Sequence, residues 1–373
     1  MKKLLITSTD LMMSQFLVPH VKFLSKNGYK IDVACSAPGG IIEEVRQMLN
    51  GYIGQLYVVR LERSPLRISN YKGLKDLKCI LANTYYDIIW TNEPVMGIMT
   101  RIAAQKARKS GTKVLYMVHG FHFYKGAPLL NWILFYPVER LASSITDTIA
   151  TINTQDYKVA KSFGTVTARY IHGIGVDTKR LNVATTKGAI KEQLGINKDS
   201  IILLSVGELN KNKNHKVVLK AMHRIQNPTI HYLLCGKGTT RSLLEKMANQ
   251  LGIADNVHFL GYRRDLAGIM CDSMVYIHPS KREGLPLAII ESMYRGLPII
   301  ASEVGGIVDL IEEGKGGYLC KCDDVEKISQ CLQQLIEDKE KCFLMGRFNQ
   351  KKALPYLIDN VLQEVKDLLD EMN

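Results

Sequence analysis

Two glutamates in an otherwise apolar stretch stand out among the acidic residues of this sequence. Residues 281–302 read KREGLPLAIIESMYRGLPIIAS, with Glu283 before a Gly-Leu-Pro loop and Glu291 inside an apolar helical segment. Carboxylates in such surroundings need a partner or a ligand, because burying an unpaired charge is costly. In a structural role, one would cap the helix and the other would lie on the helix surface. In a functional role, they would bind a ligand at the start of the helix. The spacing alone leaves both interpretations open.

The residues between the two glutamates predict a helix start that binds anions. Pro286 suits a first helical turn and Gly284 permits close approach of a ligand, so we expect a helix over 287–295. The free backbone N–H groups of 284–288 would then face the ligand. Because the carboxylates would repel a phosphate, they should accept hydrogen bonds from hydroxyls instead. A sugar nucleotide offers hydroxyls at both ends and phosphates between them.

A second polar loop supplies positive charge. The segment SVGELNKNKNHKVVLKAM starts at Ser205, with Gly207 ending a strand and a helix starting near Asn214. Lys211 and Lys213 are placed to reach diphosphate oxygens as point charges, although loop lysines are also common as solvated surface residues.

A third loop, CGKGTTRSLLE, puts Gly236 and Gly238 at a strand-to-helix turn. It lacks the GxxxxGK[ST] pattern of a P-loop, so it is weak evidence for phosphate binding on its own.

The elements that position these loops alternate along the whole chain. Apolar, β-branched runs separated by helical segments predict parallel sheets covered on both faces. With 373 residues, the chain is expected to form two doubly wound α/β domains. The strand candidates are 3–8, 30–36, 55–61, 87–92, 113–120 and 147–153 in the first half, and 200–209, 230–236, 256–262, 274–280 and 298–302 in the second. Ligands of such folds bind beyond the carboxyl ends of the strands, where the three loops lie.

The polar segment 175–200 is the best linker candidate, because it contains few large apolar residues. We therefore expect domains at 1–177 and 178–355. The C-terminal helix, 356–373, is expected to pack back on the first domain.

Positive charge is concentrated in the first half. Residues 1–175 hold 22 lysines and arginines against 11 aspartates and glutamates, whereas the remainder holds 27 against 25. Such a basic half attracts nucleic acid or an anionic membrane, or simply aids solubility. The stretches RISNYKGLKDLK and FHFYKGAPLLNWILFYPVERL add Trp132, Phe135 and Tyr136, which suit a membrane interface or a core. No signal peptide or membrane span is evident, and eight dispersed cysteines indicate free thiols in the cytoplasm.

Together, the motifs VGELNKNKNH, CGKGTT, NVHFLGY, YIHPSKREGLPLAIIESMYRGLPIIASEVGGIVDLI and EGKGGYLC resemble, in order and spacing, the donor domain of retaining glycosyltransferase family 4. Residues 114–163 look like bacterial members that build capsule or exopolysaccharide repeat units. The resemblance implies the GT-B fold, in which two domains face across a cleft. The first domain would bind the acceptor and the second a nucleotide sugar.

The resemblance also implies roles for individual residues. Glu283 and Glu291 match the E-x7-E signature and would contact the donor sugar and the ribose. Lys213 would neutralise the diphosphate, His119 would face the sugar, and no metal is needed. The other expected donor-binding residues are Gly207, Glu208, Lys211, Gly236, Tyr262, Arg263, Arg282, Gly284, Leu285 and Pro286.

Two positions depart from the family pattern. Many members have arginine where this chain has Glu208, so neutralisation of the diphosphate would rest on Lys213 and the helix start, or on Lys211 or Arg282. The family's Gly-rich loop after the first strand is replaced by TSTDLMMSQF. The contacts to the acceptor are therefore open.

The expected reaction is transfer of a sugar, with retention, from a nucleoside diphosphate, uridine being the expected base, to an acceptor hydroxyl. A lipid-diphosphate sugar at the cytoplasmic membrane surface is the expected acceptor. The alternatives are a GT-B epimerase acting on a sugar nucleotide and a non-catalytic nucleic-acid-binding protein. A glycosidase function is disfavoured, because it would leave the lysine loop without a role. A metal site at His119 and His122 is also disfavoured, because no third ligand is evident near them in the sequence.

Overall fold

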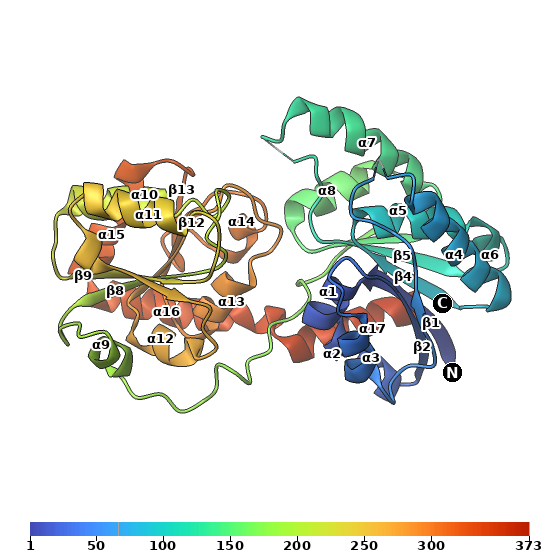
Figure 1. The fold of residues 1–373 in the computed structure, drawn as a ribbon, viewed down its shortest axis with the longest axis horizontal. Helices are drawn as coiled ribbons and strands as arrows, with labels where there is room; N and C mark the ends of the chain where they lie inside the picture. Colours follow the sequence, from blue (N-terminus) through green and yellow to red (C-terminus); the bar gives the residue numbers. More distant parts are fainter. Residues whose placement is uncertain (66, 125, 373) are drawn as a thin grey trace. The chain divides into compact units, whose positions relative to one another are not determined.

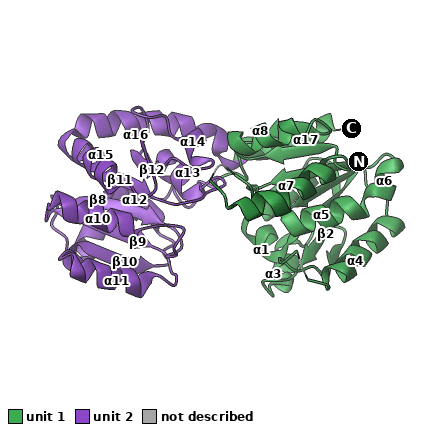
Figure 2. Cartoon of the chain, turned by 90° about the horizontal axis from the view of Figure 1, so that it is seen from above, with its two compact units in different colours: residues 1–175, 359–373 green, residues 176–358 purple. Residues whose placement is uncertain are grey.

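The chain folds into two compact units. The structure is a computed structural model that describes residues 1–65, 67–124 and 126–372. Residues 1–175 and 359–373 form unit 1, and residues 176–358 form unit 2 (Figure 2). The boundaries expected from the sequence, after 177 and after 355, differ from these by two and three residues.

Unit 1 is built on a seven-stranded parallel sheet (Figure 1). Its strands, in spatial order, are β3 (Leu56–Val58), β2 (Tyr29–Ser36), β1 (Lys2–Thr9), β4 (Ile88–Asn92), β5 (Lys113–Val118), β6 (Thr148–Thr151) and β7 (Thr167–Tyr170). In the central strands β1 and β4 nearly every residue is buried. This is the pattern of a parallel sheet covered by helices on both faces.

Helices cover the two faces of this sheet in separate groups. One face packs against α2 (Val18–Lys26), α3 (Ile42–Leu49) and α17 (Ile358–Glu371). The other packs against α4 (Asn70–Asn83), α5 (Pro94–Ala103), α7 (Leu129–Ser143) and α8 (Thr154–Ser162). A short α1 (Asp10–Met12) and a π-helical turn (Met13–Leu17) lead into α2, and α6 (Gln105–Lys109) follows α5.

Unit 2 is built on a six-stranded parallel sheet. Its spatial order is β10 (Val257–Gly261), β9 (Ile230–Cys235), β8 (Ile201–Val206), β11 (Val275–His278), β12 (Ile299–Ser302) and β13 (Gly317–Cys320). The helices α10 (Lys216–Ile225), α11 (Arg241–Gln250) and α15 (Val325–Glu337) pack on one face, and α9 (Ala189–Gln193), α12 (Leu266–Asp272), α13 (Leu287–Tyr294) and α14 (Ile307–Leu310) on the other. Two 3₁₀ turns, Ala254–Asn256 and Leu354–Tyr356, and α16 (Lys339–Ala353) complete the unit.

The segment 175–200 is not a free linker, and that interpretation was wrong. It carries α9, and three widely spaced side chains, Leu181, Ile190 and Ile196, are buried in the core of unit 2. The Asp272 carboxylate, at the end of α12, also accepts hydrogen bonds from the N–H groups of Gly188 and Ile190. The segment therefore belongs to unit 2.

Each sheet reverses its strand order once. In unit 1 the reversal lies between β1 and β4, and in unit 2 between β8 and β11. Chains leaving the carboxyl ends of two such strands diverge to opposite faces, which opens a crevice where ligands of doubly wound folds bind. In unit 2 this places the loops after Val206 and after His278 next to each other.

No helix in the described ranges is both long enough and apolar enough to cross a membrane.

Candidate functional site

The loops after β8 and β11 bring three ionisable side chains together. Glu283 Oε1 accepts hydrogen bonds from Lys213 Nζ at 2.5 Å and from His278 Nε2 at 3.0 Å. The Glu283 side chain is only 13% exposed. Burial alone would raise its pKa, but His278 and Lys213 together lower the pKa of Glu283 to about 2. Glu283 is therefore a carboxylate at neutral pH and acts only as an acceptor.

His278 is the neutral member of this cluster. It ends β11 and is buried, and burial lowers its pKa even though Glu283 favours the charged form. Its Nδ1 lies 3.1 Å from the Tyr276 hydroxyl, while its Nε2 faces Glu283. A neutral imidazole that donates from Nε2 thus holds the carboxylate in place.

Hydrogen bonds to backbone groups connect the two loops to each other. Asn212 Nδ2 donates to the Arg282 carbonyl at 3.0 Å, and Lys281 N–H donates to the Asn212 carbonyl at 2.8 Å. From the other side, Gly306 N–H donates to the Gly284 carbonyl at 3.0 Å. Lys213 and Glu283 are consequently positioned by fixed backbone rather than by flexible loops.

Helix α13 begins directly after this cluster. Pro286 takes the N-cap position, and α13 runs over Leu287–Tyr294, one residue shorter than predicted. A proline side chain has no oxygen with which to cap the first N–H groups of the helix. These groups, together with the helix dipole, favour a bound anion.

Glu291 lies in a different environment. It is 4% exposed within α13, and its carboxylate forms an ion pair with Arg180 from the segment before α9. Burial raises the pKa of Glu291, and Arg180 offsets part of that effect. Glu291 is therefore not a surface glutamate, and Glu283 does not cap α13 but binds Lys213 and His278.

The predicted glycines of the loops serve close packing. A Cβ on Gly236 would lie 1.8 Å from the Gly207 carbonyl oxygen, so the loop after β9 touches the loop after β8. Gly207 itself has φ +153° and lies against the Lys213 side chain. Both residues therefore shape the loop that presents Lys213.

The other predicted donor residues lie around the same sheet edge, with differing exposure. Glu208 and Lys211 are exposed on the loop after β8. After β10, Tyr262 is 67% exposed, and Arg263 forms an ion pair with Asp265 at 2.5 Å. Leu285 and Arg282 are partly buried beside Glu283. Among the predicted residues, Lys213 and Glu283 contact each other directly, and α13 begins close by after Pro286. The sequence pattern does not predict Arg180 or His278.

His119 follows β5 in unit 1. Its Nε2 lies 3.1 Å from Asn92 Oδ1, while Asn92 Nδ2 donates to the Thr7 carbonyl at 3.3 Å. Because that amide orientation turns Oδ1 toward the ring, His119 donates from Nε2 and keeps Nδ1 as an acceptor. Burial, with a smaller effect from His20, lowers the pKa of His119 to about 4. The ring is neutral at pH 7.

Carboxylates organise the loop that replaces a Gly-rich turn after β1. Glu93, at φ +64°, accepts hydrogen bonds from the Thr9 N–H at 2.6 Å and the Thr9 hydroxyl at 3.0 Å. Buried Asp10 accepts from the N–H groups of Leu11, Gly39 and Ile41. A non-glycine residue in this strained conformation is held by its surroundings, as is common at functional sites.

The histidines of HGFH make unrelated contacts. His119 contacts Asn92, whereas the His122 ring lies 4.8 Å from the Phe135 ring. In the described part of the chain, no three or more His, Cys, Asp or Glu side chains are arranged to hold a metal ion.

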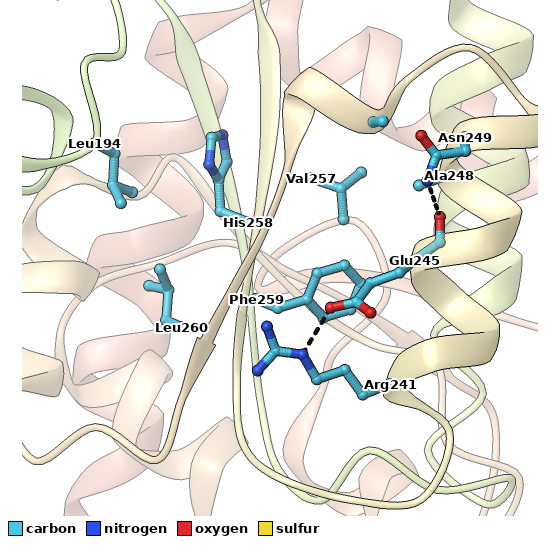
Figure 3. Close-up of a pocket in the computed structure, with 10 residues that line it drawn as sticks. Leu194, Arg241, Glu245, Ala248, Asn249, Val257, His258, Phe259 and Leu260 are labelled. Carbon is cyan, nitrogen blue, oxygen red and sulfur yellow. Dashed lines mark hydrogen bonds and ion pairs between the residues drawn. The ribbon is translucent and has the colours of Figure 1, made fainter.

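A pocket of about 420 Å³ lies away from the cluster, between α11 and the edge strand β10 (Figure 3). Arg241 donates to Glu245 at 2.7 Å and lies over the Phe259 ring, and His258 contacts His231 at 3.0 Å. Arg241 and Glu245 are thus paired within the pocket, and His258 is paired with a residue outside its lining. The pocket offers no reactive arrangement comparable to that at Glu283.

Comparison with known proteins places both units in one enzyme class. Residues 186–361 match the family described as glycosyl transferases group 1, and residues 4–153 match the family described as glycosyl transferase 4-like. A putative glycosyltransferase EpsD of Bacillus subtilis is 33% identical, covering 98% of this chain and 96% of that protein. A UDP-Gal:alpha-D-GlcNAc-diphosphoundecaprenol alpha-1,3-galactosyltransferase of Escherichia coli is 27% identical, covering 94% and 91%.

Solved structures match the whole fold. Anabaena HepE in complex with UDP superposes with a TM-score of 0.81 at 18% identity over 100% of both chains. Sucrose-phosphate synthase from Thermosynechococcus elongatus gives a TM-score of 0.78 at 18% identity, covering 100% and 99%. The expected GT-B fold is therefore confirmed. The chain belongs to the group 1, or family 4-like, glycosyltransferases and is a glycosyltransferase of the GT-B fold.

Proposed function

We propose that the protein transfers a sugar, with retention, from a UDP-sugar to a polyprenyl-diphosphate-linked saccharide during surface polysaccharide synthesis. The observation that carries this proposal is the Lys213–Glu283 pair beside the uncapped start of α13, at the reversal point of the second sheet. The printed names of relatives support the finer substrates. The Escherichia coli relative is named for UDP-Gal and a diphosphoundecaprenol-linked acceptor, and HepE was solved with UDP.

Lys213 and the start of α13 would bind the diphosphate. One hydrogen of the Lys213 ammonium reaches Glu283, which leaves two donors for phosphate oxygens. As the sugar leaves, charge grows on those oxygens, and fixed donors stabilise it without rearranging. The donor phosphate would take the acceptor proton on the same face, so that no nucleophile from the protein is required.

The two glutamates would hold the two ends of the donor. Glu283, ionised and partly buried, would accept from a hydroxyl of the transferred sugar. Glu291 would accept from the ribose diol, sharing its oxygens with Arg180. A carboxylate has about four lone-pair positions, so one arginine does not exhaust it.

Unit 1 would bind the acceptor at the inner face of the cytoplasmic membrane. Its first 175 residues hold 22 basic against 11 acidic side chains, which suits an anionic surface. His119 would contact the transferred sugar through its neutral ring. We propose that neither a metal ion nor nucleic acid takes part, since Lys213 and α13 supply the positive potential that the leaving diphosphate needs.

Screening nucleotide sugars for thermal stabilisation, then assaying the best donor with lipid-linked acceptors, tests this function. A donor at 100-fold excess over Kd should stabilise by about 2.7 kcal/mol. The anomeric coupling in the product, measured by NMR, should show the configuration of the donor. Inversion would contradict the mechanism. Conversion of the nucleotide sugar without an acceptor would indicate an epimerase instead.

A further inference from the structure

Helix α7 exposes a continuous apolar stripe. The stripe consists of Leu129, Leu130, Ile133, Leu134, Pro137, Val138 and Leu141. Its leucine, isoleucine and valine side chains are between 46% and 74% exposed. Successive positions are alternately one and three residues apart, which places all seven on one half of the helix surface. Among the exposed large apolar side chains of the described residues, no other helix carries as many.

The opposite side of α7 is already packed. Trp132 and Tyr136 lie 5.5 Å and 5.3 Å, between ring centroids, from buried Phe123, and Phe135 packs on the same cluster. Buried Glu139 also accepts from Arg101 of α5 at 2.8 Å. The aromatic residues are thus partly buried and pack against the core. They occupy the inner side of α7, and the stripe faces outward.

The helices that share this face of unit 1 with α7 carry exposed basic side chains. Helices α4, α5, α7 and α8 cover the same face of the sheet (Figure 1). Their exposed basic residues are Lys72, Lys75, Lys78, Arg140, Lys158 and Lys161. The acidic residues of these four helices are turned away or paired. Asp76 binds Arg60, and Glu139 and Asp156 are buried.

We propose that α7 is the element with which unit 1 enters an anionic lipid bilayer. The stripe inserts at the boundary between headgroups and acyl chains, and the lysines of α4 and α8 contact anionic headgroups. The proposal rests on the proposed function in one respect: a lipid-linked acceptor lies in such a membrane. A second copy of the chain fits the stripe less well, because a symmetric contact would bring two basic helix layers together.

Sedimentation with vesicles tests the stripe directly. The triple variant Leu130→Gln, Ile133→Gln and Leu134→Gln keeps helix-forming residues at exposed positions, so its melting temperature should match that of the wild type. It should bind vesicles of phosphatidylethanolamine and phosphatidylglycerol at least ~10-fold more weakly.

The matched control is the double variant Phe343→Gln and Leu344→Gln on α16 of unit 2, whose side chains are 67% and 60% exposed. Binding of this control should equal that of the wild type. Equal binding of the α7 variant would overturn the proposal.

A fluorescent variant separates bilayer insertion from self-association. The emission of Leu134→Trp, after subtraction of the wild-type spectrum, should shift to the blue with anionic vesicles and less with phosphatidylcholine alone. A shift that grows with protein concentration and needs no lipid would indicate pairing between copies and contradict the proposal. Thermal stabilisation by UDP is measured without lipid. If UDP does not stabilise the wild-type protein, the proposed function is contradicted. If UDP stabilises it but the protein does not bind vesicles, only the membrane proposal is contradicted.

Discussion

The two units share one architecture but place their charges differently. Both are doubly wound parallel sheets with one reversal of strand order. At the reversal in unit 2, Lys213 is paired with Glu283. On α13, which follows, Glu291 is paired with Arg180 from the segment before α9. At the reversal in unit 1, Glu93 is held by Thr9, and neighbouring His119 is neutral. Six exposed basic residues of unit 1 lie instead on helices α4, α7 and α8.

On the two proposals above, one fold serves two kinds of binding. Charges paired at a sheet edge, with restrained backbone around them, suit a small charged ligand that must be held in one orientation. Unpaired basic side chains spread over a helix layer suit an extended anionic surface that needs no fixed register. The topology provides the edge in both units, and the side chains decide its use.

The largest effect is expected from Lys213→Ala, which removes the positive charge from the edge of unit 2. Transfer activity, as kcat/KM for the nucleotide sugar, should fall by ~10²–10³-fold, because the leaving diphosphate loses a fixed donor. Lys220→Ala, at an exposed position of α10, is the matched control and should stay within about 2-fold. Similar losses in the two variants would mean that general charge, and not the cluster, attracts the donor.

An intermediate effect is expected from Gly236→Ala. Its Cβ would lie 1.8 Å from the Gly207 carbonyl oxygen, so the loop bearing Lys213 must move, at a cost of about 1–3 kcal/mol in unfolding free energy. Gly268→Ala on α12 is the control. A Cβ there meets no atom within 4 Å, and a helical Gly→Ala change should stabilise by about 0.5–1 kcal/mol. Chemical denaturation of both variants measures the difference, and equal stabilities would contradict the proposed loop contact.

A third effect, similar in size to that of Gly236→Ala, is a pH dependence of stability that sharpens the contrast between the two sheet edges. Because folding lowers the pKa of Glu283 from its ordinary value of 4.5 to about 2, its stabilisation is complete above pH 4.5 and is lost as the pH falls toward 2. Glu283→Gln should therefore be less stable than the wild type at pH 7, by about 2–3 kcal/mol. The gap should close between pH 4.5 and 2.

Thermal unfolding at a series of pH values measures that gap. Glu340→Gln, an exposed substitution on α16, should show none. A gap independent of pH would mean that Glu283 acts through packing rather than through its charge.

Much of the fold could be predicted from strand and helix patterns. The two strands that these patterns do not predict, β7 and β13, were missed for physical reasons. Eleven strand candidates correspond to strands, because buried parallel strands are continuous apolar runs. Strand β7 reads Thr-Ala-Arg-Tyr at a sheet edge, half exposed, so no apolar run marks it. Strand β13 begins at Gly317, where a Cβ would lie 1.9 Å from the Ile299 carbonyl oxygen. A glycine required by close packing looks, in a sequence, like a loop.

The site could be predicted where one segment contains its chemistry. Glu283 and the start of α13 are local, and Lys213 follows the adjacent strand. The partner of Glu291 could not be predicted, because Arg180 lies 111 residues away in a segment with a polar composition. The apolar residues that fix this segment, Leu181 and Ile190, are too widely spaced to show a pattern. Long-range pairing of charges leaves no local signal.

Titration of UDP into the wild type and Lys213→Ala by calorimetry tests the central claim most directly, namely that the nucleotide diphosphate binds at the Lys213–Glu283 edge of unit 2. We expect at least ~10-fold weaker binding of UDP to the variant and unchanged binding of uridine, which lacks the phosphates. Equal affinity of wild type and variant for UDP would contradict it.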